Sequence, residues 1–210
     1  MPTPTHLLYL HGFRSSPAST KARQTAARLA QLSAAPRWLC PQLPASPRDA
    51  MALATALLDG VDPRRVALIG SSLGGYYAAA LAARLGCRAA LLNPAVDPAR
   101  DLGARIGTQS CWHEPDSSFE FTARHVDELR ALDPGEPDAE TASRLLVVVA
   151  RDDEVLDWRE MTTRYRHASL RVAEHGGHAI DDYVPHHLDA VLEFLGIASP
   201  PPAIRQARTP

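Results

Sequence analysis

The sequence predicts an α/β fold, in which a mostly parallel sheet is covered by helices on both faces. Short apolar runs alternate along the chain with segments of helical periodicity, which is the pattern of strand–helix–strand units. The runs lack the alternation of a half-exposed strand, so we expect strands buried on both faces. A chain of 210 residues can bury about 70% of its unfolded surface in one domain. We expect that compact single domain to cover residues 1–198.

The first part of the chain contains two predicted strands and two predicted helices. Residues 6–11 are apolar and lead into a loop of turn-forming residues. Residues 38–41 form a second strand, which is short because its last residue is a proline without a backbone donor. Residues 21–32 place alanine and leucine side chains at helical spacing. The same spacing in residues 49–58 predicts a second helix, with Asp49 as its N-cap.

A strand, a sharp turn and a helix are predicted in residues 66–85. The apolar run ends in the pattern Gly-x-Ser-x-Gly, formed by Gly70, Ser72 and Gly74. Glycines flank a nucleophile in such a turn because the strand and the helix approach closely there. The Ser72 hydroxyl would then project above the end of the sheet. The backbone N–H of Leu73, at the positive end of the helix, would be placed to stabilise an oxyanion.

The loop after the first strand offers a second oxyanion donor. It begins His11-Gly12-Phe13, a form in which the residue after the glycine donates its backbone N–H to the substrate oxygen. Gly12 would allow the backbone to turn that amide toward the substrate. We expect Phe13 to contribute only its N–H. We expect His11 to tie down the loop by hydrogen bonds and not to transfer a proton.

Residues 97–144 interrupt the alternation of strands and helices. The segment is too long for an ordinary connection, and its aromatic residues need an apolar surface to lie against. We therefore expect a cap-like insertion over the pocket, with a short helix at residues 123–132. Trp112 and Phe121 of this insertion are expected to line the substrate pocket together with Gly12.

The remaining elements are predicted from the same two periodicities. Strands are expected at residues 89–92, 145–150 and 169–173, and helices at residues 158–167 and 184–195. Acidic residues follow the strand at 145–150, and a Gly-Gly-His turn follows the strand at 169–173. The proline-rich residues 199–210 have no apolar periodicity and are expected to form a disordered tail.

The histidine of the Gly-Gly-His turn is the expected catalytic base. A serine hydroxyl is a poor nucleophile near neutral pH and needs a base and an orienting acid, which in this type of strand–turn–helix site follow in the order serine, acid, histidine. His178 fits this order after Ser72, and the two glycines before it give a flexible approach to the turn. His175 is the competing candidate.

The acid is expected among the residues that follow the strand at 145–150. Asp153 lies in the loop two residues before an apolar pair, which is the spacing typical of the acid in such sites. Asp152 and Asp157 remain alternatives. Asp157 is better suited to cap the helix that follows it.

Composition limits the other function classes. The net charge of −2 gives no electrostatic basis for binding nucleic acid or an anionic membrane. The N-terminus lacks a basic segment followed by an apolar one, and no run approaches the roughly 18 apolar residues of a membrane span, so we expect a cytoplasmic protein. Cys40, Cys87 and Cys111 are odd in number and widely spaced, which favours neither disulfides nor a zinc site. No cofactor or metal is predicted.

The order of these motifs resembles that of the YqiA-like (UPF0227) esterases, small bacterial members of the α/β-hydrolase superfamily. The similarity spans about residues 6–196 and includes Leu8-Tyr9-Leu10-His11-Gly12-Phe13, Gly70-Ser71-Ser72-Leu73-Gly74-Gly75, Leu92-Asn93-Pro94-Ala95-Val96, Asp153-Glu154-Val155-Leu156-Asp157 and Gly176-Gly177-His178-Ala179. The resemblance implies a compact α/β hydrolase without the first antiparallel strands. It also implies a triad of Ser72, Asp153 and His178, and esterase activity on short acyl chains.

The sequence thus predicts a serine carboxylester hydrolase that cleaves short-to-medium acyl esters through an acyl-enzyme intermediate. Its expected partner is a small-molecule ester, with no nucleic acid and no membrane, and its oligomeric state is not predicted. The nearest alternative is a thioesterase acting on acyl-CoA-type substrates, since the same triad hydrolyses thioesters. A second alternative is a catalytically silent protein of the same fold that binds a ligand or a partner.

Overall fold

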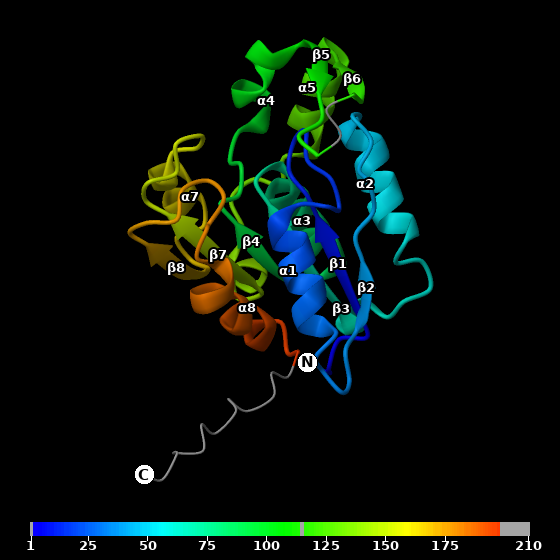
Figure 1. Cartoon of the computed structure of the whole chain (residues 1–210), viewed down its shortest axis with the longest axis vertical. Helices are drawn as coiled ribbons and strands as arrows, with labels where there is room; N and C mark the ends of the chain where they lie inside the picture. The colour runs from blue at the N-terminus through cyan, green and yellow to red at the C-terminus, as the bar shows by residue number, and fades with distance from the viewer. Residues whose placement is uncertain (1, 114–115, 198–210) are drawn as a thin grey trace, which may run out of the picture.

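The structure, a computed structural model, describes residues 2–113 and 116–197. Six strands form one sheet in the order β2-β1-β3-β4-β7-β8, and every neighbouring pair is parallel (Figure 1). These strands are β1 (His6–Leu10), β2 (Arg37–Leu39), β3 (Val66–Ser71), β4 (Arg88–Leu92), β7 (Leu145–Ala150) and β8 (Ser169–Ala173). The predicted α/β fold is therefore confirmed. The predicted disordered tail, residues 199–210, lies outside the described residues.

Helices cover both faces of this sheet. One face is covered by α1 (Thr20–Leu29) and α8 (Leu188–Phe194), which follows the π-helical turn η3 (Tyr183–His187). The other face is covered by α2 (Pro47–Ala56), α3 (Leu73–Leu85), α5 (Ala123–Leu132) and α7 (Trp158–Arg164). Two short 3-10 turns, η1 (Pro63–Arg65) and η2 (Gly103–Arg105), complete the connections.

The core forms two layers because successive side chains of a strand point to opposite faces. In β1, Leu7 and Tyr9 pack with α1 and α8, whereas Leu8 and Leu10 pack on the opposite side. All four side chains are fully buried. Strands β3 and β7 are also buried along their whole length, as their continuous apolar runs predicted. Strand β8 differs, because it lies at the edge of the sheet and most of its residues are exposed.

Most of the segment between β4 and β7 forms a separate group of short elements at the carboxyl end of the sheet, drawn at the top of Figure 1. The group contains α4 (Pro98–Asp101), the antiparallel pair β5 (Gly107–Ser110) and β6 (Ser118–Phe121), and helix α5, whereas the short helix α6 (Ala139–Ala142) leads back into the start of β7. The Tyr76 hydroxyl of α3 donates a hydrogen bond of 2.6 Å to the carbonyl of Leu129. The Arg14 guanidinium donates one of 2.7 Å to the carbonyl of Ser110. The segment is thereby joined to the core and to the loop after β1.

Helix α2 begins earlier than the sequence predicted, and α3 begins directly at the end of the predicted turn. Helix α2 has Ser46 and not Asp49 as its N-cap, because the Ser46 hydroxyl accepts the Asp49 N–H at 3.2 Å and Pro47 suits the first helical position. Helix α3 begins at Leu73, directly after the turn. Gly74 therefore belongs to the helix, where its missing Cβ allows close packing against β1.

Candidate active site

Ser72 lies at the sharp turn between β3 and α3. Its backbone has φ 55° and ψ −121°, a region that costs a non-glycine residue conformational energy. The flanking glycines are sterically required: a Cβ on Gly70 would lie 2.1 Å from the Gly74 carbonyl oxygen, and one on Gly74 would lie 1.9 Å from the Leu10 carbonyl oxygen. The Gly-x-Ser-x-Gly pattern thus permits the contact between strand and helix that holds Ser72 in this conformation.

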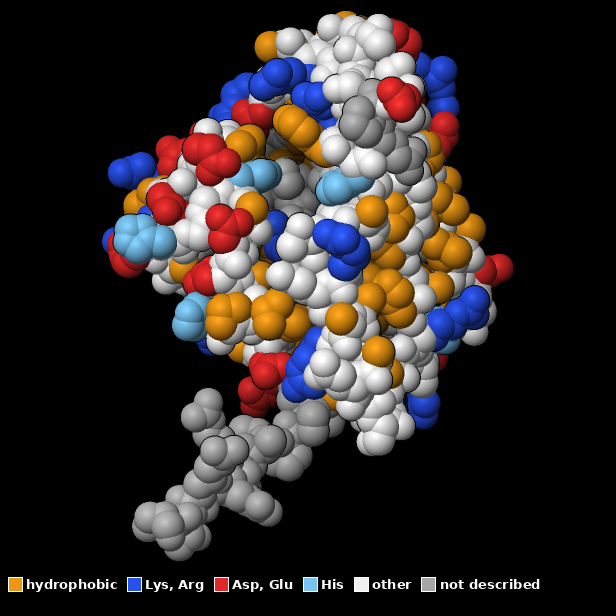
Figure 2. Space-filling model, viewed as in Figure 1, with side chains coloured by type: hydrophobic (Ala, Val, Ile, Leu, Met, Phe, Trp, Pro, Cys, Tyr) orange, Lys and Arg blue, Asp and Glu red, His pale blue; other side chains and the backbone are white. Residues whose placement is uncertain are grey.

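Ser72 and His178 line the same cavity, which has a volume of about 290 Å³. Figure 2 shows a hollow near the centre of the displayed face, with histidine side chains at its rim. The two residues come from the carboxyl ends of β3 and β8, which meet at one edge of the parallel sheet. Within the described residues, the Ser72 hydroxyl and the His178 ring share the cavity without a hydrogen bond between them.

The His178 ring is held by Asp153. Its Nδ1 lies 2.8 Å from Asp153 Oδ2 and 3.1 Å from Oδ1, and the Asp153 side chain is 0% exposed. Since a carboxylate only accepts hydrogen bonds, Nδ1 carries the proton and Nε2 keeps a free lone pair. Asp153 Oδ1 also accepts the N–H groups of Val155 and Leu156 at 2.8 and 2.9 Å. These bonds fix the carboxylate and, through it, the tautomer of His178.

The alternative acids and base lie in other environments. The His175 side chain is 89% exposed and lies 3.4 Å from Asp152. Asp152 accepts the Gly177 N–H at 2.8 Å, and this hydrogen bond is the main reason that the pKa of Asp152 is lowered. Asp157 caps α7 by accepting the Arg159 N–H at 2.9 Å. Among the three acids considered, the structure brings only Asp153 to the His178 ring.

Two residues that the sequence analysis quoted within motifs, without assigning them a role, hold the backbone around His178. Glu154 Oε2 accepts the His178 N–H at 2.9 Å. Asn93, which is fully buried at the end of β4, donates from Nδ2 to the carbonyls of Gly177 and His178 at 3.0 and 3.3 Å. Its Oδ1 accepts the Ala150 N–H of β7 at 2.8 Å. One signal in the sequence could have indicated the role of Asn93: it is a polar residue directly after an apolar strand, and such a strand ends at the edge of the sheet where the site lies.

Two backbone amides next to Ser72 are available as donors. A Cβ on Gly12 would lie 3.2 Å from the Ser72 Cβ, so the loop after β1 lies directly against the serine. In the part of the chain that the structure describes, the N–H groups of Phe13 and Leu73 have no hydrogen-bond acceptor. Both are therefore free to bind an oxyanion beside Ser72.

His11 fixes the loop that presents Phe13. Its Nε2 accepts the Leu43 N–H at 3.1 Å, so its Nδ1 is the protonated nitrogen and donates to the Gly12 carbonyl at 3.0 Å. Burial lowers the pKa of His11, which favours this neutral form. Both ring nitrogens are occupied, and His11 acts as a structural histidine.

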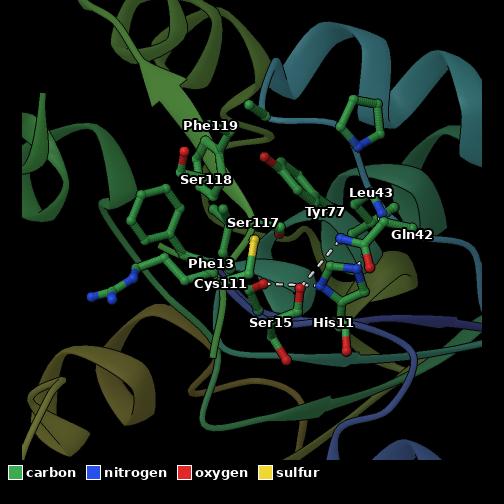
Figure 3. A pocket seen from close by; sticks show the side chains of 16 residues that line it. His11, Phe13, Ser15, Gln42, Leu43, Tyr77, Cys111, Ser117, Ser118 and Phe119 are labelled. Carbon is green, nitrogen blue, oxygen red and sulfur yellow. Dashed lines mark hydrogen bonds between the residues drawn. The ribbon is translucent and has the colours of Figure 1, made fainter. Parts of the chain in front are cut away.

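A second cavity of about 280 Å³ adjoins the first, and Gly12, Phe13 and Ser15 line both. Its wall includes Leu73. In Figure 3, Phe119 and Tyr77 lie above this cavity and Cys111 and His11 lie below it. The aromatic and aliphatic side chains make this cavity suitable for an apolar group.

The pocket residues expected from the insertion differ in their positions. Trp112 lines the first cavity, and the Arg14 guanidinium lies 4.3 Å from its ring centroid. Phe121 does not reach either of the two cavities: it is 1% exposed, and its ring packs against Phe13 at a centroid distance of 5.1 Å. Phe121 therefore lies behind the cavity wall, because its side chain fills the space between the hairpin and α5, and Phe119 of the same strand takes the lining position.

Across residues 2–113 and 116–197, no group of three or more His, Cys, Asp or Glu side chains is arranged to hold a metal ion. In the same described part of the chain, every helix is too short or too polar to cross a membrane.

Comparisons with known proteins agree with this architecture. Est1E from Butyrivibrio proteoclasticus is 16% identical, with a TM-score of 0.66 over 92% of this chain and 87% of that chain. An alpha/beta superfamily hydrolase from Oenococcus oeni PSU-1 is 18% identical, with a TM-score of 0.59 over 93% and 94% of the two chains. The Pyrococcus furiosus esterase Pf2001 is 15% identical, with a TM-score of 0.61 over 92% and 83%. At these identities the likeness establishes the fold, which is that of the α/β hydrolases.

The sequence itself identifies the family. The sequence profile of the uncharacterised protein family UPF0227 matches residues 6–196, which confirms the resemblance inferred from the motifs. The chain has the α/β-hydrolase fold and belongs to the UPF0227 family.

Proposed function

We propose that the protein is a serine carboxylester hydrolase that uses Ser72 as nucleophile, His178 as base and Asp153 as the orienting acid. One observation supports this function most strongly: a serine in a strained turn at a helix N-terminus shares a cavity with a histidine whose Nδ1 is bound to a buried carboxylate. The strain at Ser72 is of the kind that accumulates at functional sites. An ordinary strand-to-helix turn has no need of it.

The mechanism follows from the positions of the donors and acceptors. His178 Nε2 takes the Ser72 proton as the hydroxyl oxygen attacks the ester carbonyl. The N–H groups of Phe13 and Leu73 bind the oxyanion that develops on the carbonyl oxygen. His178 then gives the proton to the leaving alcohol and activates a water that hydrolyses the acyl-enzyme. Asp153 keeps Nδ1 protonated and stabilises the imidazolium.

The two cavities suggest where the two halves of an ester lie. The alcohol half lies in the cavity of His178, because the leaving oxygen must receive its proton from that ring. The acyl half lies in the adjoining cavity beside Leu73, where Tyr77 and Phe119 provide apolar contacts. A volume of about 280 Å³ fits short-to-medium acyl chains. The Pyrococcus protein of similar fold is named an esterase, which agrees with this reaction class.

The test is the hydrolysis of para-nitrophenyl esters, from acetate to long acyl chains, by the protein and by Ser72→Ala. We expect turnover of the shorter esters and a loss of at least about a thousandfold in the variant, as for removal of a triad member. A parallel series of acyl-CoA thioesters distinguishes a thioesterase. If the native protein and Ser72→Ala are equally inactive on all of these substrates, the proposal is refuted and a ligand-binding protein is favoured.

A further inference from the structure

Lys21, the only lysine of the chain, lies on the wall of the cavity that contains Ser72 and His178. It belongs to the first turn of α1, and its side chain is partly buried. Its Nζ donates a hydrogen bond of 2.5 Å to the carbonyl of Ala179, the residue after the catalytic histidine. A cation is thus placed beside the reacting groups, although the mechanism proposed above does not use it.

The charge of Lys21 is incompletely balanced by its neighbours. Asp181 and Asp153 favour the ammonium, yet burial outweighs both and lowers the pKa of Lys21 to about 8. An ammonium has three N–H donors, and within the described residues only the one that binds Ala179 has an acceptor. A further anion in the cavity would therefore stabilise the charged lysine.

The N-terminus of α1 adds donors to the same part of the cavity. Ser19, the N-cap, and Thr20 both line the cavity. The Ser19 hydroxyl is buried, does not cap the helix and makes no hydrogen bond of standard geometry in the described structure, although it lies near the Tyr9 hydroxyl. The first turn contains no acidic residue, so the positive end of this ten-residue helix is not neutralised from within. A hydroxyl that does not cap its helix, an ammonium and a helix N-terminus together suit an anionic ligand.

Beside Asp181 and Asp153, which act on Lys21, one acidic residue is among those that line the cavity. Glu154 lines the cavity as well, and its Oε2 accepts the His178 N–H. The Glu154 carboxylate is therefore bound to the backbone of the histidine turn. The residues that α1 contributes to the cavity are Ser19, Thr20 and Lys21.

We propose that Lys21, together with the Ser19 hydroxyl and the N-terminus of α1, binds an anionic group on the alcohol half of the ester substrate. The inference rests on the proposed esterase function and adds a substrate class to it. The alcohol half is the one concerned because the leaving oxygen must lie beside His178, in the cavity that Lys21 also lines. The anionic group is a carboxylate or a phosphate, since both are bound by an ammonium and by helix N-termini.

The test uses two esters of the same shape that differ only in charge, para-butyryloxybenzoate and para-butyryloxybenzamide. The quantity measured is the ratio of kcat/KM for the anionic ester to that for the neutral ester, in the native protein and in Lys21→Met. We expect the ratio to fall by about tenfold or more in the variant, in line with the loss of a hydrogen bond to a charged group. A third ester, para-butyryloxyphenyl phosphate, shows whether the phosphate or the carboxylate gives the larger ratio.

Arg23→Met is the matched control. Arg23 lies two residues further along α1, is exposed, and is not among the residues that line the cavity. The variant removes the same unit of charge from the same helix, and it should keep the native ratio. A Lys21 that only held the Ala179 carbonyl would slow both esters equally. An unchanged ratio in Lys21→Met would therefore overturn the proposal.

A binding measurement keeps this test separate from the test of catalysis. The leaving alcohol, para-hydroxybenzoate, is titrated calorimetrically into Ser72→Ala and into Ser72→Ala/Lys21→Met. We expect the second protein to bind it at least about tenfold more weakly. Equal affinities would refute the anion site even in an active esterase. A difference in a protein that hydrolyses none of the esters would support the site and refute only the proposed reaction.

Discussion

Replacing Asn93 by alanine should weaken both the fold and the proposed reaction. The fully buried Asn93 side chain joins β4 to the Ala150 N–H of β7 and to the two carbonyls at Gly177 and His178. No other described side chain makes hydrogen bonds to all three of these segments of the sheet edge. Alanine would leave a buried N–H and two carbonyls without their partner.

The expected loss can be worked from these contacts. Three hydrogen bonds at about 0.5–1.5 kcal/mol each amount to roughly 2–4 kcal/mol. Asn93 also has φ 41°, and this left-handed conformation costs alanine about 1 kcal/mol more. For a chain of this length each kcal/mol lowers Tm by about 2–4 °C, so the total of roughly 3–5 kcal/mol should make Asn93→Ala melt about 6–20 °C below the native protein. The control variant Asn93→Gly loses the same hydrogen bonds without the backbone cost and should melt between the two.

Two assays check the prediction. Thermal unfolding gives the change in Tm. Ester hydrolysis, measured well below the Tm of the variant, should show a fall in kcat/KM of at least about tenfold, because the turn that holds the His178 ring loses two of its anchors. A variant with the native Tm and native kcat/KM would show that Asn93 does not hold the histidine turn.

Three further predictions concern the loop after β1, the second cavity and a buried histidine. Gly12→Ala should lower kcat by about tenfold or more, with a smaller effect on Tm. The new Cβ would lie 3.2 Å from the Ser72 Cβ and displace the neighbouring oxyanion donor, the Phe13 N–H. An unchanged kcat would count against Phe13 as a donor. Phe119→Ala should raise kcat/KM for octanoyl esters relative to butyryl esters, since the side chain lines the second cavity, and an unchanged profile would place the acyl chain elsewhere. Burial lowers the pKa of His187, so the unfolded chain binds its proton more readily than the folded protein does. The free energy of unfolding, measured in urea, should therefore decrease as pH falls below about 6.5, and His187→Gln should reduce this slope; an equal slope in both proteins would assign the effect to other groups.

The turn at Ser72 was predictable because its causes are local. Gly70, Ser72 and Gly74 lie within five residues, and the steric contact between strand and helix that requires them follows from their spacing. The central strands β1, β3, β4 and β7 were predictable for a similar reason, since burial on both faces imposes continuous apolar runs. The hairpin of β5 and β6 was not predicted, because its residues are mostly polar and partly exposed. The order of serine, acid and histidine along the chain limited the acid to a few neighbouring residues, among which Asp153 is the one that lies at the His178 ring.

The remaining features depend on contacts between distant segments. The role of Asn93 follows only when β4, β7 and the histidine turn are brought together. Phe119 and Phe121 share one face of β6, and packing against Phe13 decides which of them is buried. The cap of α2 was predicted wrongly as Asp49, because the sequence pattern does not show that Ser46, the serine before the proline, accepts the Asp49 N–H and takes the position.

The central claim is that Ser72 is a nucleophile activated by His178. The most direct measurement is labelling with a fluorophosphonate probe, followed by intact-mass analysis and peptide mapping. We expect one label on Ser72, no label in Ser72→Ala, and labelling slowed by about a thousandfold or more in His178→Ala. A native protein that does not react, or that reacts at another residue, would contradict the account.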